Sequence, residues 1–493
     1  MAGIGFELRK LLRTQTYTGL IRSYGYAGLI SSGPWVLSIG VIVALGMLSL
    51  AHVQDAREVG AFQVSVTYLV AVSLILSGLA QLVYTRYVAD RLYEKRADAV
   101  LPNLIGVLTL GNVIAGAFAA GVILLLFGGT PLLYRVEMFI TFVTLCNIWV
   151  LTVFLAGMKN YLSILWCFVA GYGTVLVLGL ALRPWGLVGL LGAFCIGQAI
   201  LLLSLLYLVM SAYPSDRLVE WDILRSDRTY RSLIFTGFFY NLGIWVDKFM
   251  FWYDPATSIP VIGPLRASPI YDFPMFLAYL SIVPGMAVFL IRMETDFAEH
   301  YDYYYDAIRQ GDTLARIEEQ RGGMIDTARQ GIYEIFKIQG ITIAILLLLA
   351  PLIMRVVGFS DLYVPLFDID IVGVGAQLLL LAILNTLFYL NRLILALCLC
   401  ALFVAGNFVL TWLSQRLGVP FYGYGFAVSL GLVSLVGLVM LSRVFDSLTY
   451  ETFMLQAGPE NNPHERSNVF RRGARKRGRQ AEPGIAPGEA GGT

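Results

Sequence analysis

Two neighbouring charged side chains lie within an apolar stretch of the chain, where charges are rare. Asp247 and Lys248 follow Asn241 and Trp245 in the run Tyr240–Lys248. A charge at the centre of a bilayer costs roughly 2.5–3.5 kcal/mol on insertion scales, so its presence suggests a cavity or a partner. Neighbouring helix positions point about 100° apart, so the two charges need not pair with each other. Two interpretations remain open. The charges could have a structural role, in an ion pair to another helix or with the lysine snorkelling to the outer interface, or they could line a transport path.

Prolines interrupt two of the apolar stretches. Pro34 ends the sequence Ser31–Pro34, and we expect a kink there because proline removes a backbone donor and clashes one turn back. Pro274 and Pro284 are expected to break a second stretch. In lipid, such breaks persist only where neighbouring helices, serine hydroxyls or water satisfy the freed backbone groups. Each break is therefore either an ordinary kink in a packed helix or part of a broken helix that faces a transport cavity.

We find no catalytic motif in the sequence. It contains no phosphate-cradling glycine-rich loop, no Gly-x-Ser-x-Gly elbow and no zinc-ligand spacing, so we expect no catalytic residue, no bound metal and no cofactor. Asp368 and Asp370 form an Asp-x-Asp pair, but we expect both, like Asp272, to be solvated near the outer ends of helices. The five cysteines lie in apolar runs, which indicates buried thiols rather than disulfides.

The composition is that of a polytopic membrane protein. Of the 493 residues, 58% are hydrophobic and 14% are charged, against about 45–50% and 25% in soluble domains. We therefore predict an all-α fold with about twelve transmembrane helices, since roughly 20 apolar residues cross the hydrocarbon core. The predicted segments are 24–50, 62–85, 101–127, 137–157, 161–182, 186–210, 232–253, 272–291, 333–354, 367–390, 393–414 and 421–442.

The basic residues predict how these segments are oriented. If the first segment runs outward from the cytoplasm, most of the 35 Lys and Arg residues fall in cytoplasmic loops, as the positive-inside rule requires. The exceptions are Arg57, Arg135, Arg183, Lys248, Arg266, Arg355 and Arg416. This orientation places both termini in the cytoplasm.

The chain is predicted to consist of five regions, two of them six-helix lobes. The motif Tyr17-x-x-Leu20-Ile21 recurs as Tyr230-x-x-Leu233-Ile234, which suits parallel repeats. The last region, residues 457–493, carries a cluster of basic residues, for which attraction to membrane lipids is the simplest role. Nucleic-acid binding is not expected there, because no aromatic residues interleave the charges. The regions are an amphipathic cytoplasmic N-terminus (1–16), an N-terminal lobe (17–211), a cytoplasmic inter-lobe loop (212–231), a C-terminal lobe (232–456) and a disordered basic tail (457–493).

The longest cytoplasmic insertion, residues 292–331, reads as a mixed-charge helical hairpin. It is too short for a catalytic domain. It could be a solvated extension of the flanking helices, or a surface that docks a partner, because aromatic residues concentrate at interfaces. The candidate docking residues are Tyr301, Tyr303, Tyr304, Tyr305, Arg309 and Arg316.

Two stretches near the N-terminus carry a family resemblance. Residues 1–12, MAGIGFELRKLL, and residues 24–35, YGYAGLISSGPW, resemble the PelG family of exopolysaccharide export proteins. This family is related to the polysaccharide-transporter branch of the multidrug/oligosaccharidyl-lipid/polysaccharide flippase superfamily. The resemblance covers residues 1 to about 456. It implies two lobes in the bacterial inner membrane and the export of a growing galactosaminoglycan. It also implies three partners: a PelF-like cytosolic glycosyltransferase, a PelD-like cyclic-di-GMP receptor and a PelE-like membrane protein.

Three functions compete at this point. The first is a polysaccharide-exporting membrane subunit beside a cytosolic synthase. The second is a lipid-linked oligosaccharide flippase or a cation-coupled antiporter of the same superfamily. An antiporter should need a buried, titratable carboxylate in its N-terminal lobe. The six predicted segments of that lobe contain only Glu137, at a segment boundary, which argues against an antiporter. The third is a non-transporting scaffold that anchors the synthase through residues 292–331.

Overall fold

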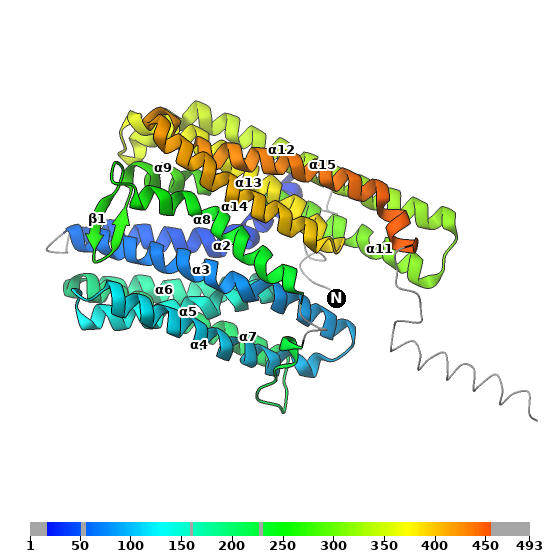
Figure 1. Cartoon of the computed structure of the whole chain (residues 1–493), viewed down its shortest axis with the longest axis horizontal. Helices are drawn as coiled ribbons and strands as arrows, with labels where there is room; N and C mark the ends of the chain where they lie inside the picture. Colours follow the sequence, from blue (N-terminus) through cyan, green and yellow to red (C-terminus); the bar gives the residue numbers. More distant parts are fainter. Residues whose placement is uncertain (1–16, 51–55, 158–160, 226–229, 455–493) are drawn as a thin grey trace, which may run out of the picture. The chain divides into compact units, whose positions relative to one another are not determined.

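The computed structural model describes residues 17–50, 56–157, 161–225 and 230–454, and nearly all of these residues are helical (Figure 1). The chain forms two compact units, Met1–Leu438 and Val439–Thr493. The helices are α2 (Tyr17–Leu50), α3 (Ala56–Tyr93), α4 (Val100–Leu126), α5 (Leu132–Gly157), α6 (Tyr161–Leu182), α7 (Gly186–Ala212), α8 (Arg231–Tyr253), α9 (Pro269–Leu280), α10 (Val283–Ile291), α11 (Ala298–Gln310), α12 (Leu314–Val357), α13 (Val364–Tyr389), α14 (Leu393–Leu417) and α15 (Tyr424–Met454).

These helices confirm a polytopic all-α membrane protein. Eight helical runs within the described residues are long and apolar enough to cross a membrane, and ten if each of two bent pairs counts as one span. The run Leu162–Ala212 takes in both α6 and α7, and α8 is not among the spans. The predicted number of about twelve spans is therefore not confirmed.

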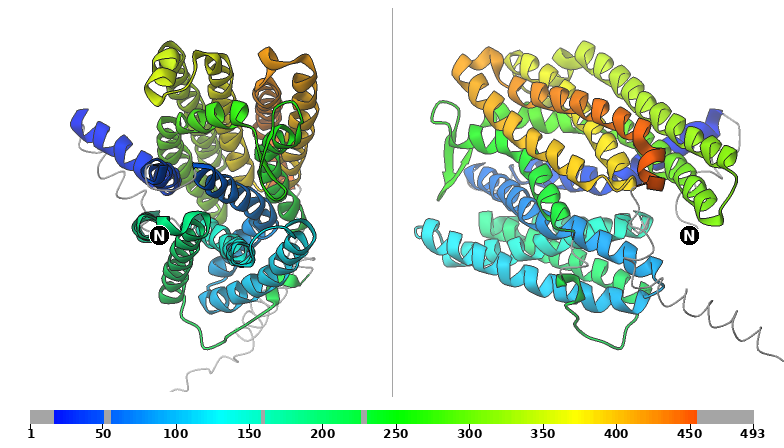
Figure 2. Two further views of the ribbon diagram at one scale, coloured as in Figure 1. Left: turned by 90° about the vertical axis from the view of Figure 1, so that its left-hand side faces the viewer. Right: turned by 45° about the vertical axis from the view of Figure 1, so that its right-hand side comes forward.

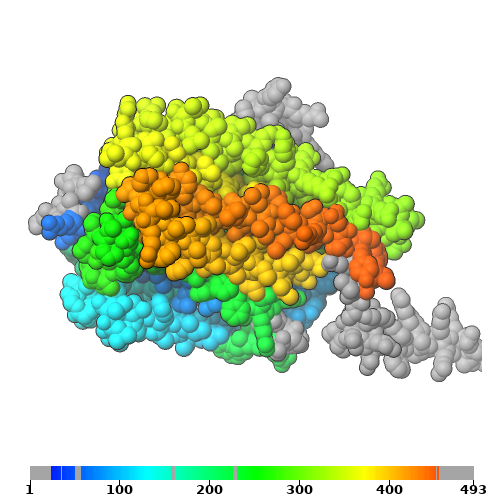
Figure 3. Space-filling model, turned by 45° about the horizontal axis from the view of Figure 1, so that its top comes forward, coloured from blue at the N-terminus to red at the C-terminus, as the bar shows by residue number. Residues whose placement is uncertain are grey.

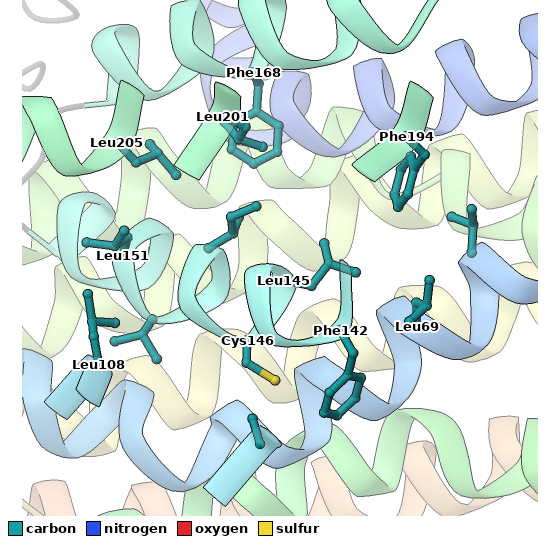
Figure 4. Packing of buried hydrophobic residues seen from close by; sticks show 14 of the residues in the cluster. Leu69, Leu108, Phe142, Leu145, Cys146, Leu151, Phe168, Phe194, Leu201 and Leu205 are labelled. Atoms are coloured by element: carbon teal, nitrogen blue, oxygen red, sulfur yellow. The ribbon is translucent and has the colours of Figure 1, made fainter. Parts of the chain in front are cut away.

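Helices α3 to α7 enclose a large apolar core, and we call α2–α7 the N-terminal bundle. Leu145 and Cys146 of α5 lie between Leu201 of α7 and Leu69 of α3 (Figure 4). Leucine, valine and phenylalanine supply most of this core, since an intramembrane bundle is apolar on every face. The thiol of Cys146 donates to the carbonyl oxygen of Ser73 at 3.8 Å, and all five cysteines are free.

Helices α8–α14 and the first part of α15 form a second group, which we call the C-terminal bundle. Within it, α8 packs on α14, and α13 packs on both α9 and α12. Gly243 permits the close approach of α8 to α14, because a Cβ at this position would lie 2.4 Å from the Phe403 ring. Helix α12, in yellow-green, lies at the surface, and its apolar window is only 11% buried (Figure 3). The exposed apolar side chains of α12 are those expected to face lipid.

The two bundles meet along α3 and α8 and through α2. Gly78 of α3 and Gly237 of α8 let the two backbones touch, because a Cβ on Gly237 would lie 2.3 Å from the carbonyl oxygen of Gly78. Helix α2 bends by 61° between its Tyr24–Pro34 and Val36–Ser49 parts, which confirms the predicted kink. Its first part packs on α10, and its second part packs on α6.

A β-hairpin that the sequence analysis does not predict joins α8 to α9. Strands β1 (Ile259–Ile262) and β2 (Leu265–Ala267) pair antiparallel, with Gly263 at φ +53° in the turn. The hairpin lies at the end of the molecule where α3 begins (Figures 1 and 2). The Tyr68 hydroxyl of α3 donates to the Arg266 carbonyl at 2.9 Å and accepts from the Arg266 amide at 3.4 Å. A strand of the C-terminal half is thereby fastened to the N-terminal bundle.

The insertion at 292–331 is helical, as predicted. A π-helical segment, Arg292–Phe297, continues α10 into α11, and Gly311 at φ +71° turns the chain into α12. Arg292 holds this junction through ion pairs with Asp296 at 2.7 Å and with Glu334 of α12. The division into two six-helix lobes at residues 212–231 stays a prediction, and the predicted N-terminal segment 1–16 and basic tail 457–493 lie outside the described residues.

Candidate functional site

Asp247 and Lys248 form a buried ion pair near the end of α8. The Lys248 Nζ lies 3.0 Å from the Asp247 Oδ2, and the two residues are 4% and 0% exposed, respectively. Lys248 therefore does not snorkel to an interface. Although neighbouring side chains diverge on a helix, the four-carbon stem of Lys248 is flexible enough to return its ammonium to the adjacent carboxylate.

The Asp247 carboxylate accepts hydrogen bonds from three different residues. Besides Lys248, the hydroxyl of Tyr271 on α9 donates to Oδ2 at 2.6 Å, and the amide of Asn407 on α14 donates to Oδ1 at 3.3 Å. Thr411 donates to the Asn407 Oδ1 at 2.9 Å, which fixes the orientation of that amide. Asp247 thus joins three helices of the C-terminal bundle through charge-assisted hydrogen bonds.

The Lys248 ammonium is enclosed by oxygens and aromatic rings. It donates to the Ile244 carbonyl at 2.9 Å and to the Tyr279 hydroxyl at 3.3 Å, in addition to Asp247. Its Nζ lies 4.5 Å from the ring centroid of Phe426 and 5.2 Å from that of Tyr279, within cation–π range. All three donors of the ammonium are used within the described residues, so Lys248 has none left for a substrate in this conformation.

Asp370 belongs to the same site, and the expectation that it is solvated is wrong. Helix α13 begins at Val364, so Asp370 lies inside the helix, and it is 0% exposed. It lies within electrostatic range of both Asp247 and Lys248. Neither of its carboxylate oxygens has a hydrogen-bond partner within the described part of the chain. The site thus contains two carboxyl groups and one ammonium.

The other two acids near this end of the bundle have different environments. Asp272 accepts from the Trp252 indole at 2.8 Å and from the Ser268 amide at 3.0 Å, so it holds the first turn of α9. It is half-buried rather than simply solvated. Asp368 is also half-buried and lies two residues before Asp370 in α13. Neither Asp272 nor Asp368 makes a hydrogen bond with the Asp247 carboxylate.

Asn241 and Trp245 lie on α8 but face the N-terminal bundle instead. The Asn241 amide donates to the Leu74 carbonyl of α3 at 2.9 Å and to Gln81 at 3.5 Å. Trp245 packs on the N-terminal core and on Trp252, with ring centroids 6.2 Å apart, and its indole N–H has no partner among the described residues. These two residues form part of the contact between bundles, apart from the Asp247 site.

The three prolines occupy separate places. Pro34 lies half-buried at the bend of α2. Pro274 is buried inside α9, which continues through it, so the expectation that it breaks the segment is wrong. The break occurs at Ser281 and Ile282, just before Pro284 at the start of α10, and the two helices are bent by 40°.

The candidate docking residues divide into a buried and an exposed set. Tyr304 is 0% exposed, and Tyr301 packs on Tyr389 of α13 with ring centroids 5.4 Å apart, whereas Tyr303 is 49% exposed. The expectation of a cluster of exposed tyrosines is therefore wrong for Tyr304, and Tyr301 and Tyr305 are half-buried. Arg309 and Arg316 are exposed and pair with Asp306 and Asp312.

The described residues contain no group of three His, Cys, Asp or Glu side chains that could hold a metal ion. The arrangement in the C-terminal bundle can instead bind and release a proton or reorganise its ion pair, because the ammonium that is paired with Asp247 also lies within electrostatic range of Asp370.

The fold resembles that of known transporters. An outward-facing multidrug resistance MATE family transporter of the MOP superfamily aligns with a TM-score of 0.63 and 14% identity, over 86% of this chain and 96% of that one. A MOP superfamily transporter from Pyrococcus furiosus gives a TM-score of 0.61 and 14% identity, over the same shares of the two chains. A MATE protein in the bent conformation gives 0.60 and 14%, over 88% and 96%. Identity at this level shows a common fold. A comparison with curated proteins gave no match.

A family model matches nearly the whole described chain. It is the model of PelG, whose description is "Putative exopolysaccharide Exporter (EPS-E)", and it covers residues 1–453. The match includes both bundles and the hairpin between them, and it ends near the end of α15. This chain therefore belongs to the PelG family.

Proposed function

We propose that this protein exports an exopolysaccharide across the bacterial inner membrane. The observation that carries the proposal is the match to the PelG exporter family over residues 1–453, on a chain whose fold resembles MATE transporters. In this proposal the polymer is a growing galactosaminoglycan of the Pel type, and the chain moves it without enzymatic chemistry of its own.

The contact between the bundles supports a conduit rather than a passive anchor. Gly78 and Gly237 allow α3 and α8 to touch at their backbones, while α2 packs on both bundles across its bend. A small backbone contact between α3 and α8 would let the two bundles rotate against each other, because few side chains must repack when they move. Transporters with paired bundles alternate access to the substrate by such rocking.

The direction of export requires an orientation, and the basic loops supply one. We propose that both termini are cytoplasmic and that the turn between α11 and α12 faces the cytosol, as the positive-inside rule indicates. The β-hairpin would then lie on the periplasmic side, where its Tyr68–Arg266 hydrogen bonds close that end of the contact between bundles.

A cytosolic glycosyltransferase of the PelF type is the proposed donor of the polymer, with PelD-like and PelE-like membrane partners. The exposed face of α11 and the start of α12 offers Tyr303, Arg309 and Arg316 for docking. Aromatic and arginine side chains are the residue types that most often dominate interfaces. Because Tyr304 supports the helix from inside, only the exposed set should be altered in a test.

The experiment compares a docking variant with a matched buried variant in cells that make the polymer. Tyr303→Ala combined with Arg309→Ala and Arg316→Ala should keep the chain folded but reduce both co-purification of the glycosyltransferase and polymer release. Tyr304→Phe should leave both unchanged. Removing residues 293–331 is unsuitable, because Ile317, Met324 and Ala328 of this stretch are buried. If the triple variant co-purifies normally, this docking surface is wrong; if the folded chain is dispensable for release, the export function is wrong.

A further inference from the structure

Asp370 is a completely buried acid of the C-terminal bundle whose carboxyl group makes no hydrogen bond through either oxygen within the described residues. Among the described residues, the titratable groups within electrostatic range of it include Asp247 and Lys248 on α8, and Tyr271 and Tyr279 on α9. From the chain before α15, the backbone of Gly423 closes the site, since a Cβ there would lie 2.8 Å from the Asp370 Oδ1.

The nearest ammonium and the Tyr271 hydroxyl already donate to other acceptors. The Lys248 ammonium donates to Ile244, Asp247 and Tyr279, and the Tyr271 hydroxyl donates to Asp247. An ionised carboxylate without donors is strongly disfavoured in an apolar interior, and such a group neutralises instead. With Asp247 and Lys248 paired, one additional positive charge balances the site.

A proton supplies that charge better than a metal ion does. A metal would need several oxygen ligands and would stand close to an ammonium, and no three metal-ligating side chains gather within the described residues. We propose that Asp370 is a proton-binding site, and that Lys248 moves from Asp247 towards Asp370 when the proton leaves. The step is balanced: the Asp370 O–H bond breaks, the electron pair stays on the carboxylate, and the proton passes to water.

Asp247 can remain ionised without Lys248. It keeps the donors Tyr271 at 2.6 Å and Asn407 at 3.3 Å when the ammonium departs, so it is not left uncompensated. Because Asp247 and Asp370 stand on different helices, α8 and α13, transfer of the ammonium changes which helices are linked. Coupling of this change to polymer movement rests on the proposed function, whereas proton binding itself does not.

The test measures the proton directly, without polymer. Infrared spectra of the purified full chain in lipid vesicles should show the carbonyl stretch of a buried protonated acid at neutral pH. That band should shift in deuterated buffer, weaken as the pH rises, and be absent from Asp370→Asn. The half-buried neighbour Asp368→Asn, on the same helix, should retain the band. Persistence of the band in Asp370→Asn, or its absence from the parent, would overturn the proposal.

The melting temperature of Asp370→Asn is a second, independent test of whether Asp370 is protonated. Asparagine resembles a protonated aspartate in shape and charge, so Asp370→Asn should fold and melt close to the parent at neutral pH. A large fall in melting temperature, or failure to fold, would contradict the proposal, because it would mean that Asp370 is ionised and bound to Lys248. If the infrared band disappears in Asp370→Asn but cells carrying this variant release polymer normally, Asp370 binds a proton that is not coupled to export.

Discussion

Gly78 on α3 and Gly237 on α8 face each other so closely that neither position has room for a side chain. A Cβ on Gly237 would lie 2.3 Å from the Gly78 carbonyl oxygen, and a Cβ on Gly78 would lie 2.8 Å from the Gly237 carbonyl oxygen. Both obstacles are backbone atoms, which cannot rotate away. Small residues at helix contacts allow such backbone approach within membranes.

Replacing Gly237 with alanine should therefore separate the bundles. We expect Gly237→Ala to destabilise the chain by about 1–3 kcal/mol, as overpacking generally does, and to reduce polymer release. Thermal unfolding in detergent and quantification of released polymer measure the two effects. Gly60→Ala on α3 is the matched control, because nothing lies within 4 Å of its Cβ position. Equal melting temperatures for Gly237→Ala and Gly60→Ala would show that α3 and α8 can move apart without a loss of stability.

Removing the Asp247 carboxylate should be costly, because it takes away the acceptor to which the buried Lys248 ammonium is bound. Breaking one partner of a buried ion pair typically costs about 3–5 kcal/mol, so Asp247→Ala should strongly lower the melting temperature. The pair Arg355–Asp361 is the control: its atoms are 3.1 Å apart, but both side chains are more than half exposed. Asp361→Ala should cost about 0–1 kcal/mol. Similar losses in the two variants would contradict the burial of Asp247.

The Tyr68 hydroxyl should hold the β-hairpin to α3. Tyr68→Phe removes both hydrogen bonds to Arg266, so amide hydrogen exchange in residues 259–267 should become faster. Tyr84→Phe, also on α3, is the control, because its hydroxyl donates to the Val100 carbonyl at 3.0 Å and not to the hairpin. Unchanged exchange in Tyr68→Phe would mean that apolar packing alone holds the hairpin.

Tyr304 should act through its ring and not through its hydroxyl. The side chain is 0% exposed, and the hydroxyl has no partner in the described part of the chain. Tyr304→Phe should leave the melting temperature unchanged or raise it, whereas Tyr304→Ala should cost about 3–5 kcal/mol through the cavity it creates. A marked loss in Tyr304→Phe would reveal a hydrogen bond that the structure lacks.

Much of the fold could be predicted, because it depends on apolar length and on local chemistry. The membrane segments coincide with helices, and Pro34 marks the bend of α2. Pro274 shows the limit: α9 passes through it, so a proline alone does not predict where a helix breaks. The hairpin escaped prediction because its strands, Ile259–Ile262 and Leu265–Ala267, are too short to show a clear alternation.

The candidate site could be predicted only in part, because it is assembled from distant segments. Asp247 and Lys248 were identifiable as charges within an apolar run. Their partners Tyr271, Asn407 and Asp370 come from three other helices, and nothing in the local sequence brings them together. Asp370 was misjudged because hydropathy places a segment's ends to within a few residues, and a shift of one turn separates a solvated carboxylate from a buried one.

The most direct test of the export function asks where the polymer accumulates when the chain is absent. In cells that make the polymer, the chain would be depleted, and polymer would then be quantified inside and outside spheroplasts. A conduit predicts that polymer remains in the cytosol, bound to its glycosyltransferase, and that the full-length chain restores release. Polymer that reaches the periplasm at the normal rate without this chain would contradict the export function.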